Sequence, residues 1–460
     1  MQPVLTVAEM QRVDARAQAE TPLEELVARA GTAVAVAALD LLGGAYGRRV
    51  VVIAGKGNNG ADGRVAAGLL ARRGARVTVV GPGEVGVIGA DGPPVDLVID
   101  AAFGTGFRGT YDAPRVAAGV PVLAVDIPSG VAGDTGAAGG AVLPATATVT
   151  FAARKPGLVQ GDGVRLAGEV TVADIGLPLG DAWIALVEDA DLADRLPPRD
   201  PGGNKWAAAV LVAAGSPGMT GAAALCAAAA YRAGSGMVRL GVPGGSLEDL
   251  PATEAVGVAL PGDGWADVAL EVAARCRAVV VGPGLGRAKG TGAQVRWLVA
   301  RSACPVVVDA DGLSVLGRLD ARPLEASAPV VLTPHDGEFE RLIGHPPGPD
   351  RVGAARHLAR VSGAVALLKG PTTAVADPSG RVLLATAGTP ALASAGTGDV
   401  LAGVIGAFLA RGVPPLEAAA LGAHVHGRAG ALGHPSGLVA GDLPDLVARV
   451  LDGDGRHRTS

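Results

Sequence analysis

The sequence predicts an α/β protein with two domains, each built on a mostly parallel sheet. Short continuous runs of Val, Ile and Leu alternate with Ala-rich stretches of helical length, which indicates strands that are buried on both faces. The chain has 460 residues, more than one core usually supports. It is rich in Gly and Pro, but its hydrophobic content of 49% exceeds that of disordered chains, so we expect it to fold.

The first domain is expected to begin with a helix. Thr6 and Glu9 are spaced as a capping box, and an apolar side of the helix follows it. This side consists of Val7, Met10, Val13 and Ala17. Strands are then predicted at residues 50–53, 77–80, 97–99, 122–125 and 170–172.

A domain boundary is predicted at residues 196–203, where Pro and Gly interrupt every apolar period. The domains would cover residues 1–195 and 200–460. Strands of the second domain are expected at 210–212, 279–281, 306–308, 330–332 and 365–368. The uncharged stretch 206–231 could span a bilayer by length, but residues 215–218 (Gly-Ser-Pro-Gly) interrupt it, so we predict a strand, a loop and a buried helix.

Charge and cysteine usage exclude several classes of protein. The formal net charge of −5 provides no positive field for nucleic acid or for an anionic membrane surface. Cys226, Cys276 and Cys304 form no Cys-x-x-Cys pair, and the first residues lack the pattern of a signal peptide. We therefore expect a cytoplasmic protein that acts on small molecules, with no nucleic-acid or membrane partner. A homo-oligomer is a separate expectation, which neither charge nor cysteine usage provides.

A glycine-rich loop at residues 55–63 connects the first predicted strand to a helix. Its backbone amides could hold an anion at the helix N-terminus. The spacing matches neither a Walker loop nor the dinucleotide fingerprint, and a tight strand-to-helix turn accounts for the glycines equally well. The loop alone therefore leaves binding and turn formation as alternatives.

Polar residues follow two later strands of the first domain. Asp100 comes after strand 97–99, and Asp126 comes after strand 122–125 in the segment Asp-Ile-Pro-Ser-Gly, which contains Ser129. Carboxyl ends of parallel strands meet at the ligand-binding edge of a sheet. With the Asn side chains of the glycine-rich loop, these groups suit a hard cation and leave one carboxylate for acid–base chemistry. Taken singly, either Asp could be a helix cap or a turn residue.

Three segments of the first domain resemble the NAD(P)H-hydrate epimerase family: Asn-Asn-Gly-x-Asp, Asp-Ala-x-x-Gly-Thr-Gly and Asp-Ile-Pro-Ser-Gly, in this order. The resemblance implies a Rossmann-like, three-layer α/β/α domain that interconverts the R and S hydrates of NADH and NADPH. It implies that K⁺ binds Asn59, Asp100 and Ser129, and that Asp126 is the acid–base group. The residues that it implies for substrate binding are Asn58, Asn59, Gly60, Ala61, Asp62, Gly104, Thr105, Gly106, Phe107, Arg108, Gly109, Thr110 and Asp126. This chain departs from the family pattern at Ala61, where a second glycine is usual, and at Ala28-Arg29, where Glu-Asn is usual.

The second domain has a glycine-rich helix start of its own. Residues 396–399 (Gly-Thr-Gly-Asp) precede the apolar stretch 400–409, so the backbone amides could hold a phosphate while Asp399 reaches a nearby hydroxyl. A plain glycine-rich helix entry is the alternative. Segments 282–286, 333–338 and 369–373 each follow a predicted strand, and His335 lies in the second of them. All of these segments should meet at one edge of the sheet.

These motifs, together with Asp309-Ala310-Asp311 and Gly-Thr-Gly-Asp-Val-Leu-Ala-Gly, resemble the ribokinase-like superfamily and, more closely, its NAD(P)H-hydrate dehydratases. The resemblance implies a nucleotide site and a hydrate site with Mg²⁺, in which Asp399 accepts a hydroxyl proton. The residues implied for ADP are Lys369, Gly370, Pro371, Thr372, Thr373 and Gly398, and those implied for the hydrate are Ala222, Gly286, His335 and Asp399. Asn204-Lys205-Trp206 replaces the usual His-Lys-Gly.

Together the two resemblances predict a bifunctional enzyme that repairs the hydrates NADHX and NADPHX with ADP. ADP is preferred over ATP by resemblance alone, because prokaryotic two-domain members use ADP. Two alternatives stay open at this point: a kinase of a vitamin precursor in the second domain, and a non-catalytic binding module or scaffold in the first.

Overall fold

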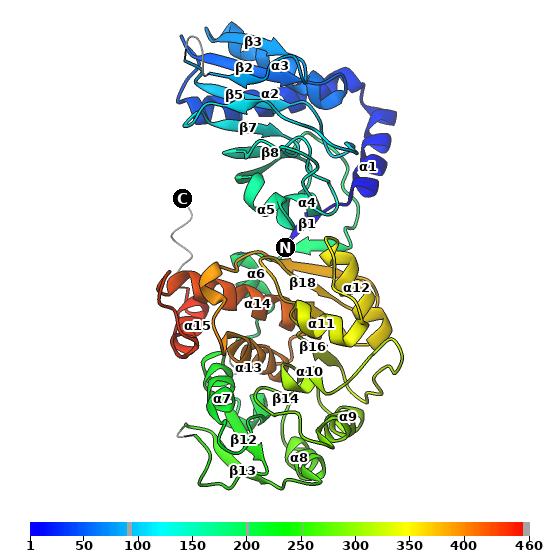
Figure 1. Ribbon diagram of the computed structural model, residues 1–460, viewed down its shortest axis with the longest axis vertical. Helices are drawn as coiled ribbons and strands as arrows, with labels where there is room; N and C mark the ends of the chain where they lie inside the picture. Colours follow the sequence, from blue (N-terminus) through cyan, green and yellow to red (C-terminus); the bar gives the residue numbers. More distant parts are fainter. Residues whose placement is uncertain (90–93, 199–201, 252, 454–460) are drawn as a thin grey trace. The chain divides into compact units, whose positions relative to one another are not determined.

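The computed structural model describes residues 1–89, 94–198, 202–251 and 253–453 (Figure 1). It divides into two compact units, which are Gln2–Trp183 and Ile184–Ser460 together with Met1. Each unit contains a sheet with its own hydrophobic core. The mixed α/β class predicted from the sequence is confirmed.

The N-terminal unit is built on a parallel sheet in the order β3-β2-β5-β7-β8-β9. Its strands are β2 (Arg49–Ala54), β3 (Arg76–Val80), β5 (Leu97–Ala101), β7 (Val122–Val125), β8 (Ala147–Phe151) and β9 (Glu169–Ala173). The sequence predicted all of them except β8. In β8, Thr148 and Thr150 are fully buried between apolar residues, so the strand lacks the continuous apolar run that marks the others.

Helices cover one face of this sheet. They are α1 (Val7–Glu20), α2 (Leu23–Leu42) and α3 (Asn58–Arg72), and α2 and α3 pack against each other and against the strands. The predicted capping box of α1 is confirmed, because Thr6 and Glu9 exchange hydrogen bonds of 2.9 and 3.3 Å. A second apolar cluster covers the other face, with contributions from Ile88 and Tyr111. The short elements of the unit are β1 (Gln2–Val4), β4 (Val87–Ile88), β6 (Arg115–Val116), α4 (Pro156–Val159) and α5 (Gly163–Leu166).

The C-terminal unit has a larger sheet, in which its strands follow the order β10-β19-β18-β17-β16-β15-β14-β11-β12-β13. β18 (Thr373–Ala376) runs antiparallel to both neighbours, and the other pairs are parallel. The sequence predicted β11 (Ala209–Ala213), β14 (Ala278–Val281), β15 (Val306–Val308), β16 (Val330–Leu332) and β17 (Val365–Leu368). It missed β18 and also β10 (Ile184–Leu186), β12 (Met237–Pro243), β13 (Val256–Leu260) and β19 (Val382–Ala385).

One apolar core of this unit lies between its sheet and α7, α13 and α14. The helices are α6 (Asp189–Arg195), α7 (Gly221–Arg232), α8 (Trp265–Ala273), α9 (Thr291–Arg301), α10 (Asp311–Ser314), α11 (Asp336–Ile343), α12 (Arg351–Ser362), α13 (Thr397–Ala410), α14 (Pro415–Leu432) and α15 (Leu443–Leu451). Residues 206–231 form the predicted strand, loop and helix, as β11 and α7. Within the described parts of the chain, no helix combines the length and apolarity needed to cross a bilayer.

The two units separate between Trp183 and Ile184, earlier than the predicted boundary at 196–203. The cause is β10, which pairs in parallel with β19 and so joins residues 184–195 to the C-terminal sheet. The amino group of Met1 pairs with Asp191 in the same unit. The predicted linker therefore lies inside the C-terminal unit, and its residues 199–201 fall outside the described part of the chain.

Candidate active sites

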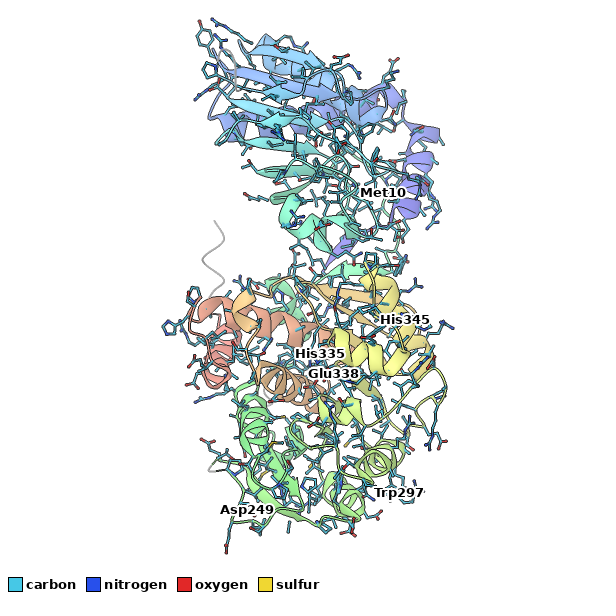
Figure 2. The ribbon with its side chains drawn as sticks, viewed as in Figure 1. Met10, Asp249, Trp297, His335, Glu338 and His345 are labelled. Carbon is cyan, nitrogen blue, oxygen red and sulfur yellow. The ribbon has the colours of Figure 1, made fainter. Side chains whose placement is uncertain are left out.

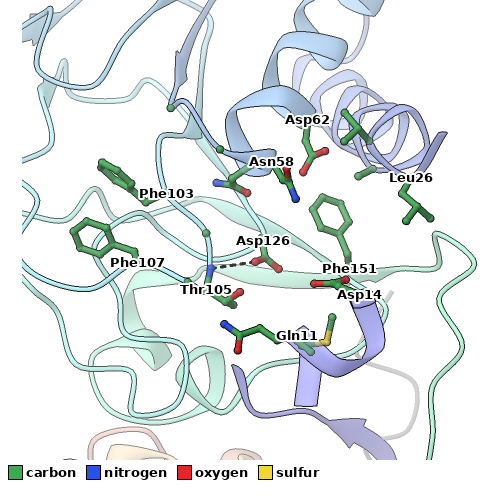
Figure 3. A pocket seen from close by; sticks show the side chains of 18 of the residues that line it. Gln11, Asp14, Leu26, Asn58, Asp62, Phe103, Thr105, Phe107, Asp126 and Phe151 are labelled. Carbon is green, nitrogen blue, oxygen red and sulfur yellow. Dashed lines mark hydrogen bonds between the residues drawn. The ribbon is translucent and has the colours of Figure 1, made fainter. Parts of the chain in front are cut away.

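The N-terminal unit contains a cavity of about 1030 Å³ at the carboxyl ends of its parallel strands (Figure 3). Its lining comes from α1 and α2, from the start of α3, from the loop 103–108, from β8 and from residues that follow β7, β8 and β9. Most of the substrate-binding residues predicted from the sequence line it: Asn58, Asn59, Asp62, Gly104, Thr105, Gly106, Phe107, Arg108 and Asp126. Gly60, Ala61, Gly109 and Thr110 are not among the lining residues.

The Asn-Asn-Gly-x-Asp segment forms the first turns of α3, which begins at Asn58 after Gly57 as N-cap. Gly60 is required by packing, because a Cβ there would lie 1.9 Å from the carbonyl oxygen of Gly55. This close contact presses the start of α3 onto the end of β2. Gly60 thus has a structural role, while Asn58 and Asp62 face the cavity.

Asp126 lines the cavity and has an unusual backbone conformation. Its φ of +69° is in the left-handed region, where a residue other than Gly is uncommon and where strain is often found at functional sites. The carboxylate accepts hydrogen bonds from Lys155 Nζ (2.6 Å), Thr150 Oγ1 (3.2 Å) and the Thr105 amide (3.3 Å), the last drawn in Figure 3. These three donors hold both of its oxygens in one position.

Lys155 is the counter-ion of Asp126, and its side chain is only 1% exposed. Its ammonium group also donates to Thr150 Oγ1 (2.8 Å) and to the carbonyl oxygen of Phe151 (3.1 Å), so all three of its donors are used. Burial raises the pKa of Asp126, but the charge and the hydrogen bonds of Lys155, with those of Thr105 and Thr150, lower it below the ordinary value. Asp126 is therefore a carboxylate at neutral pH.

Two further carboxyl groups face the same cavity, Asp14 from α1 and Asp62 from α3 (Figure 3). Burial raises the pKa of Asp62 to about 8, and the nearby charges of Asp126 and Asp14 add to this effect. Burial also raises the pKa of Asp14, partly offset by Lys155. The cavity therefore combines a carboxylate that stays ionised with a carboxyl group that keeps its proton near neutral pH.

Beneath the cavity, Asp100 and Ser129 form a tight buried pair. Ser129 donates to Asp100 through its hydroxyl (2.6 Å) and its amide (2.9 Å), and the hydroxyl also accepts from the Phe103 amide (2.9 Å). Asp100 is 1% exposed, and burial raises its pKa despite these hydrogen bonds. Asn59 lies nearby, since a Cβ on Gly104 would be 3.4 Å from its Oδ1, and its Nδ2 is buried without a partner in the described residues. Two of the predicted potassium ligands, Asp100 and Ser129, are thus in direct contact, and Asn59 lies against the loop that begins after Phe103.

In the C-terminal unit, buried charges gather at the carboxyl ends of β15, β16 and β17. Lys369 Nζ lies 2.6 Å from Asp309 Oδ1, and the Thr333 hydroxyl donates to the same oxygen at 2.6 Å. The other oxygen of Asp309 is buried without a partner among the described residues. A Cβ on Gly398 would lie 3.3 Å from Lys369 Nζ, so the start of α13 reaches this group. Lys369 and Gly398, both predicted to contact the nucleotide, are therefore neighbours.

Asp399 lies in the first turn of α13, whose N-cap is Gly396 with a φ of +89°. Burial raises the pKa of Asp399 to about 6, Asp309 adds to the rise, and Lys369 opposes it. The side chain is mostly unprotonated at neutral pH and can accept a proton there. This is the state that a general base requires.

His335 and Glu338 lie side by side at the start of α11 (Figure 2). His335 is the N-cap: its Nδ1 accepts hydrogen bonds from the amides of Gly337 (3.0 Å) and Glu338 (3.3 Å), so only Nε2 is left for a ligand. The Gly286 amide donates to Asp311 Oδ2 at 3.0 Å. Ala222 belongs to the first turn of α7, where a Cβ on Gly284 would lie 3.0 Å from its methyl group.

Sequence reasoning missed several residues of both sites. Lys155 follows β8, the strand that was not predicted, and the Lys-Pro-Gly sequence gave no chemical signal by itself. Asp14 lies four residues after Met10 on the predicted apolar side of α1, and a carboxyl group in that position was a signal that could have been used. Asp309 and Glu338 were noticed only as parts of motifs.

Both units match known families. A family model described as NAD(P)H-hydrate dehydratase matches residues 210–451, and one described as YjeF-related protein N-terminus matches residues 23–87 and 84–157. The bifunctional NAD(P)H-hydrate repair enzyme Nnr of Mycobacterium leprae is 39% identical over 480 residues, with 98% of each chain covered. This chain belongs to the bifunctional NAD(P)H-hydrate repair enzyme family.

A second member of the family and a solved dehydratase structure agree with this assignment. The Nnr enzyme of Salinibacter ruber is 38% identical over 99% of this chain and 98% of its own. A crystal structure of the ADP/ATP-dependent NAD(P)H-hydrate dehydratase of Bacillus subtilis, co-crystallised with ATP and Mg²⁺, covers 58% of this chain and 96% of its own, with a TM-score of 0.50 and 31% identity. A ribokinase-like protein of Enterococcus faecalis shares the fold, with a TM-score of 0.52 at 20% identity over 61% of this chain and 99% of its own. The alternatives of a vitamin-precursor kinase and a non-catalytic first domain are not favoured.

Proposed function

We propose that this chain repairs hydrated nicotinamide cofactors through two activities. The N-terminal unit interconverts the R and S hydrates of NADH and NADPH, and the C-terminal unit uses ADP to dehydrate the S form, releasing AMP and phosphate. The observation that carries this proposal is that the family's two parts both match this chain, and each match contains a buried carboxylate cluster. The N-terminal cavity of about 1030 Å³ is also at the upper end of the range for ligands of drug size, about 300–1,000 Å³.

In the proposed epimerase site, Asp126 accepts a proton from the hydrate. Its ion pair with Lys155 keeps it ionised, and the Thr105 amide and Thr150 hydroxyl fix its orientation. The glycine at position 104 lets the loop pass close to this carboxylate, since a Cβ there would lie 3.2 Å from Asp126 Oδ2. The substrate contacts proposed from the family resemblance are residues 58–62 and 104–110.

The residues proposed for K⁺ suit such an ion. Asp100 is a fully buried carboxyl group with no basic side chain among its hydrogen-bond partners, and Asn59 and Ser129 add uncharged oxygen atoms, the donor type that hard cations prefer. Asn59, Asp100 and Ser129 would hold the ion, which would supply a fixed positive charge beneath the cavity. The ion would also balance the negative charge of Asp100.

In the proposed dehydratase site, Asp399 accepts the proton of the ring hydroxyl while the oxygen attacks the β-phosphoryl group of ADP. Phosphate then leaves from the ester, driven by the lone pair of the ring nitrogen, and the neighbouring ring carbon loses a proton, which restores the ring double bond. Hydroxide therefore never has to leave. Residues 369–373 and Gly398 would bind the nucleotide, and Ala222, Gly286 and His335 would contact the hydrate. Mg²⁺ would neutralise charge on the moving phosphoryl group, and the carboxylates of Asp309 and Glu338 are suitable oxygen ligands for it.

A direct test incubates the purified full chain with mixed R and S hydrates, Mg²⁺ and either ADP or ATP. We expect the absorbance of the reduced cofactor to recover completely with ADP and more slowly with ATP. No consumption of either epimer would reject the repair function. Faster turnover with ATP would leave the repair function standing and reject ADP as the donor.

Location and assembly are further proposals. Cys226, Cys276 and Cys304 are all free thiols, which supports a reduced, cytoplasmic compartment. A homo-oligomer remains our prediction, and light scattering of the purified chain measures it.

A further inference from the structure

Three carboxyl groups share the N-terminal cavity with one buried ammonium group. Asp14 comes from α1, Asp62 from α3 and Asp126 from the end of β7 (Figure 3). Lys155 follows β8. All four line the same cavity. If all four groups were charged, together they would carry a net charge of −2, which is costly for buried side chains without further cations.

The positive charge of Lys155 is already committed to Asp126, as the 2.6 Å contact shows. Neither Asp14 nor Asp62 forms a side-chain hydrogen bond with any described residue, and Asp62 is the more enclosed, at 6% exposure. Other charged groups that line the cavity are Lys56, after β2, and Arg108, in the loop after β5. No ion pair links either of them to Asp62 within the described residues. Asp62 therefore has the strongest reason of the three to keep its proton.

We propose that Asp62 is a second catalytic residue of the epimerase site, the general acid that works opposite the base Asp126. This inference rests on the proposed epimerase activity and deepens it. Epimerisation requires one proton to leave the substrate and another to arrive, and a single ionised Asp126 provides only the first of these. A neutral carboxyl group in the same cavity provides the second.

The proposed step balances without any further reactant. Asp126 takes the proton of the ring hydroxyl, the oxygen forms a double bond to its carbon, and the bond from that carbon to the ring nitrogen breaks. The nitrogen keeps the electron pair and takes a proton from Asp62, which gives an open-chain aldehyde. After rotation about the adjacent carbon–carbon bond, the nitrogen attacks the other face of the aldehyde, and both protons return to the residues that held them.

The ionisation of the two groups fits these roles. Burial, with the negative charges of Asp126 and Asp14, raises the pKa of Asp62 to about 8, whereas the pKa of Asp126 is lowered. Two carboxyl groups whose surroundings drive their pKa values apart form the usual acid–base pair of an enzyme site. The acid form of Asp62 and the base form of Asp126 coexist over the whole neutral range.

The test compares three variants in the full chain: Asp62→Asn, Asp62→Glu and, as a matched control, Asp40→Asn. Asp40 is an exposed residue of α2 that does not line the cavity. We expect Asp62→Asn to lower kcat for epimerisation by about 10²- to 10⁴-fold, with a much smaller change in KM. Asp62→Glu should restore part of the rate. In the unchanged chain, the rate should fall as the pH rises through about 8, because the acid loses its proton.

Two results would overturn the proposal. One is an Asp62→Asn variant that epimerises as fast as Asp40→Asn. The other is an Asp62→Asn variant whose KM rises while kcat and the pH profile of kcat stay unchanged, because that pattern indicates a role in binding alone. Hydrogen–deuterium exchange of peptides from the N-terminal unit, compared with the unchanged chain, reports that this unit is folded in each variant. Failure of the proposed epimerase function is distinguishable, because then the unchanged chain would not interconvert the epimers at all.

Discussion

Replacing Lys155 with Met should destabilise the N-terminal unit strongly, because it removes the counter-ion of a buried carboxylate. The Lys155 ammonium group makes three short contacts, to Asp126 Oδ1 (2.6 Å), Thr150 Oγ1 (2.8 Å) and the Phe151 carbonyl oxygen (3.1 Å). Removing one partner of a buried ion pair costs about 3–5 kcal/mol, since the other charge stays buried without compensation. The pKa of Asp126 should rise as well, because the charge that lowers it is lost.

The double variant Lys155→Met/Asp126→Asn should recover much of this loss, because neither partner then carries a charge. Hydrogen–deuterium exchange of the full chain measures the effect locally, in peptides that cover β8 and α4. A loss of about 3–5 kcal/mol in the free energy of local unfolding corresponds to about 10²- to 10⁴-fold faster exchange of the amide hydrogens that local unfolding exposes. Lys289→Met is the control, since Lys289 is exposed and lies in the other unit.

The single variant should therefore exchange much faster than the double variant, and the control should match the unchanged chain. Equal protection in Lys155→Met and in the unchanged chain would refute the reasoning. Faster exchange in the double variant than in the single variant would also refute it, since it would mean that the Asp126 charge is not what the lysine compensates.

Three further perturbations test other parts of the account. Gly60→Ala should abolish epimerisation and spare dehydration, because the new Cβ would lie 1.9 Å from the carbonyl oxygen of Gly55. Gly57→Ala should be tolerated, because a Cβ at that position would have no atom within 4 Å. Equal epimerisation rates for the two variants in a coupled assay would contradict this. The rate of dehydration should fall as the pH is lowered through about 6, because Asp399 must be unprotonated to act as a base; a rate that stays flat from pH 8 to pH 5 would contradict that role. Replacing K⁺ by choline should slow epimerisation by the unchanged chain but not by Asp100→Asn, and identical rates for the unchanged chain in both salts would argue against the potassium site.

The fold was largely predictable because most strands are continuous apolar runs. β7 (Val122–Val125) is fully buried and was predicted with its observed bounds. The exception in the N-terminal sheet, β8, contains two buried threonines whose hydroxyls are satisfied inside the protein, Thr148 by the carbonyl oxygen of Ala167 at 2.6 Å. Only the structure shows that such polar positions are internal.

The candidate sites were predictable where a motif brings its residues together along the chain. Asp126, Asn59 and Lys369 were proposed in this way, and the first two line the N-terminal cavity. Lys155 and Asp14 were not, because they reach the cavity from segments that are distant in sequence and carry no motif. The domain boundary was misplaced for a related reason: whether residues 184–195 belong to one unit or the other depends on the pairing of β10 with β19, which composition does not reveal.

The central claim is that one chain carries two chemically independent sites, with bases at Asp126 and Asp399. Progress curves of Asp126→Asn and Asp399→Asn on mixed hydrates with ADP and Mg²⁺ measure this most directly. We expect Asp399→Asn to abolish dehydration while still interconverting the epimers. Asp126→Asn should dehydrate the S fraction at the normal rate and then stop, apart from slow spontaneous epimerisation. Loss of both activities in both folded variants would contradict the claim.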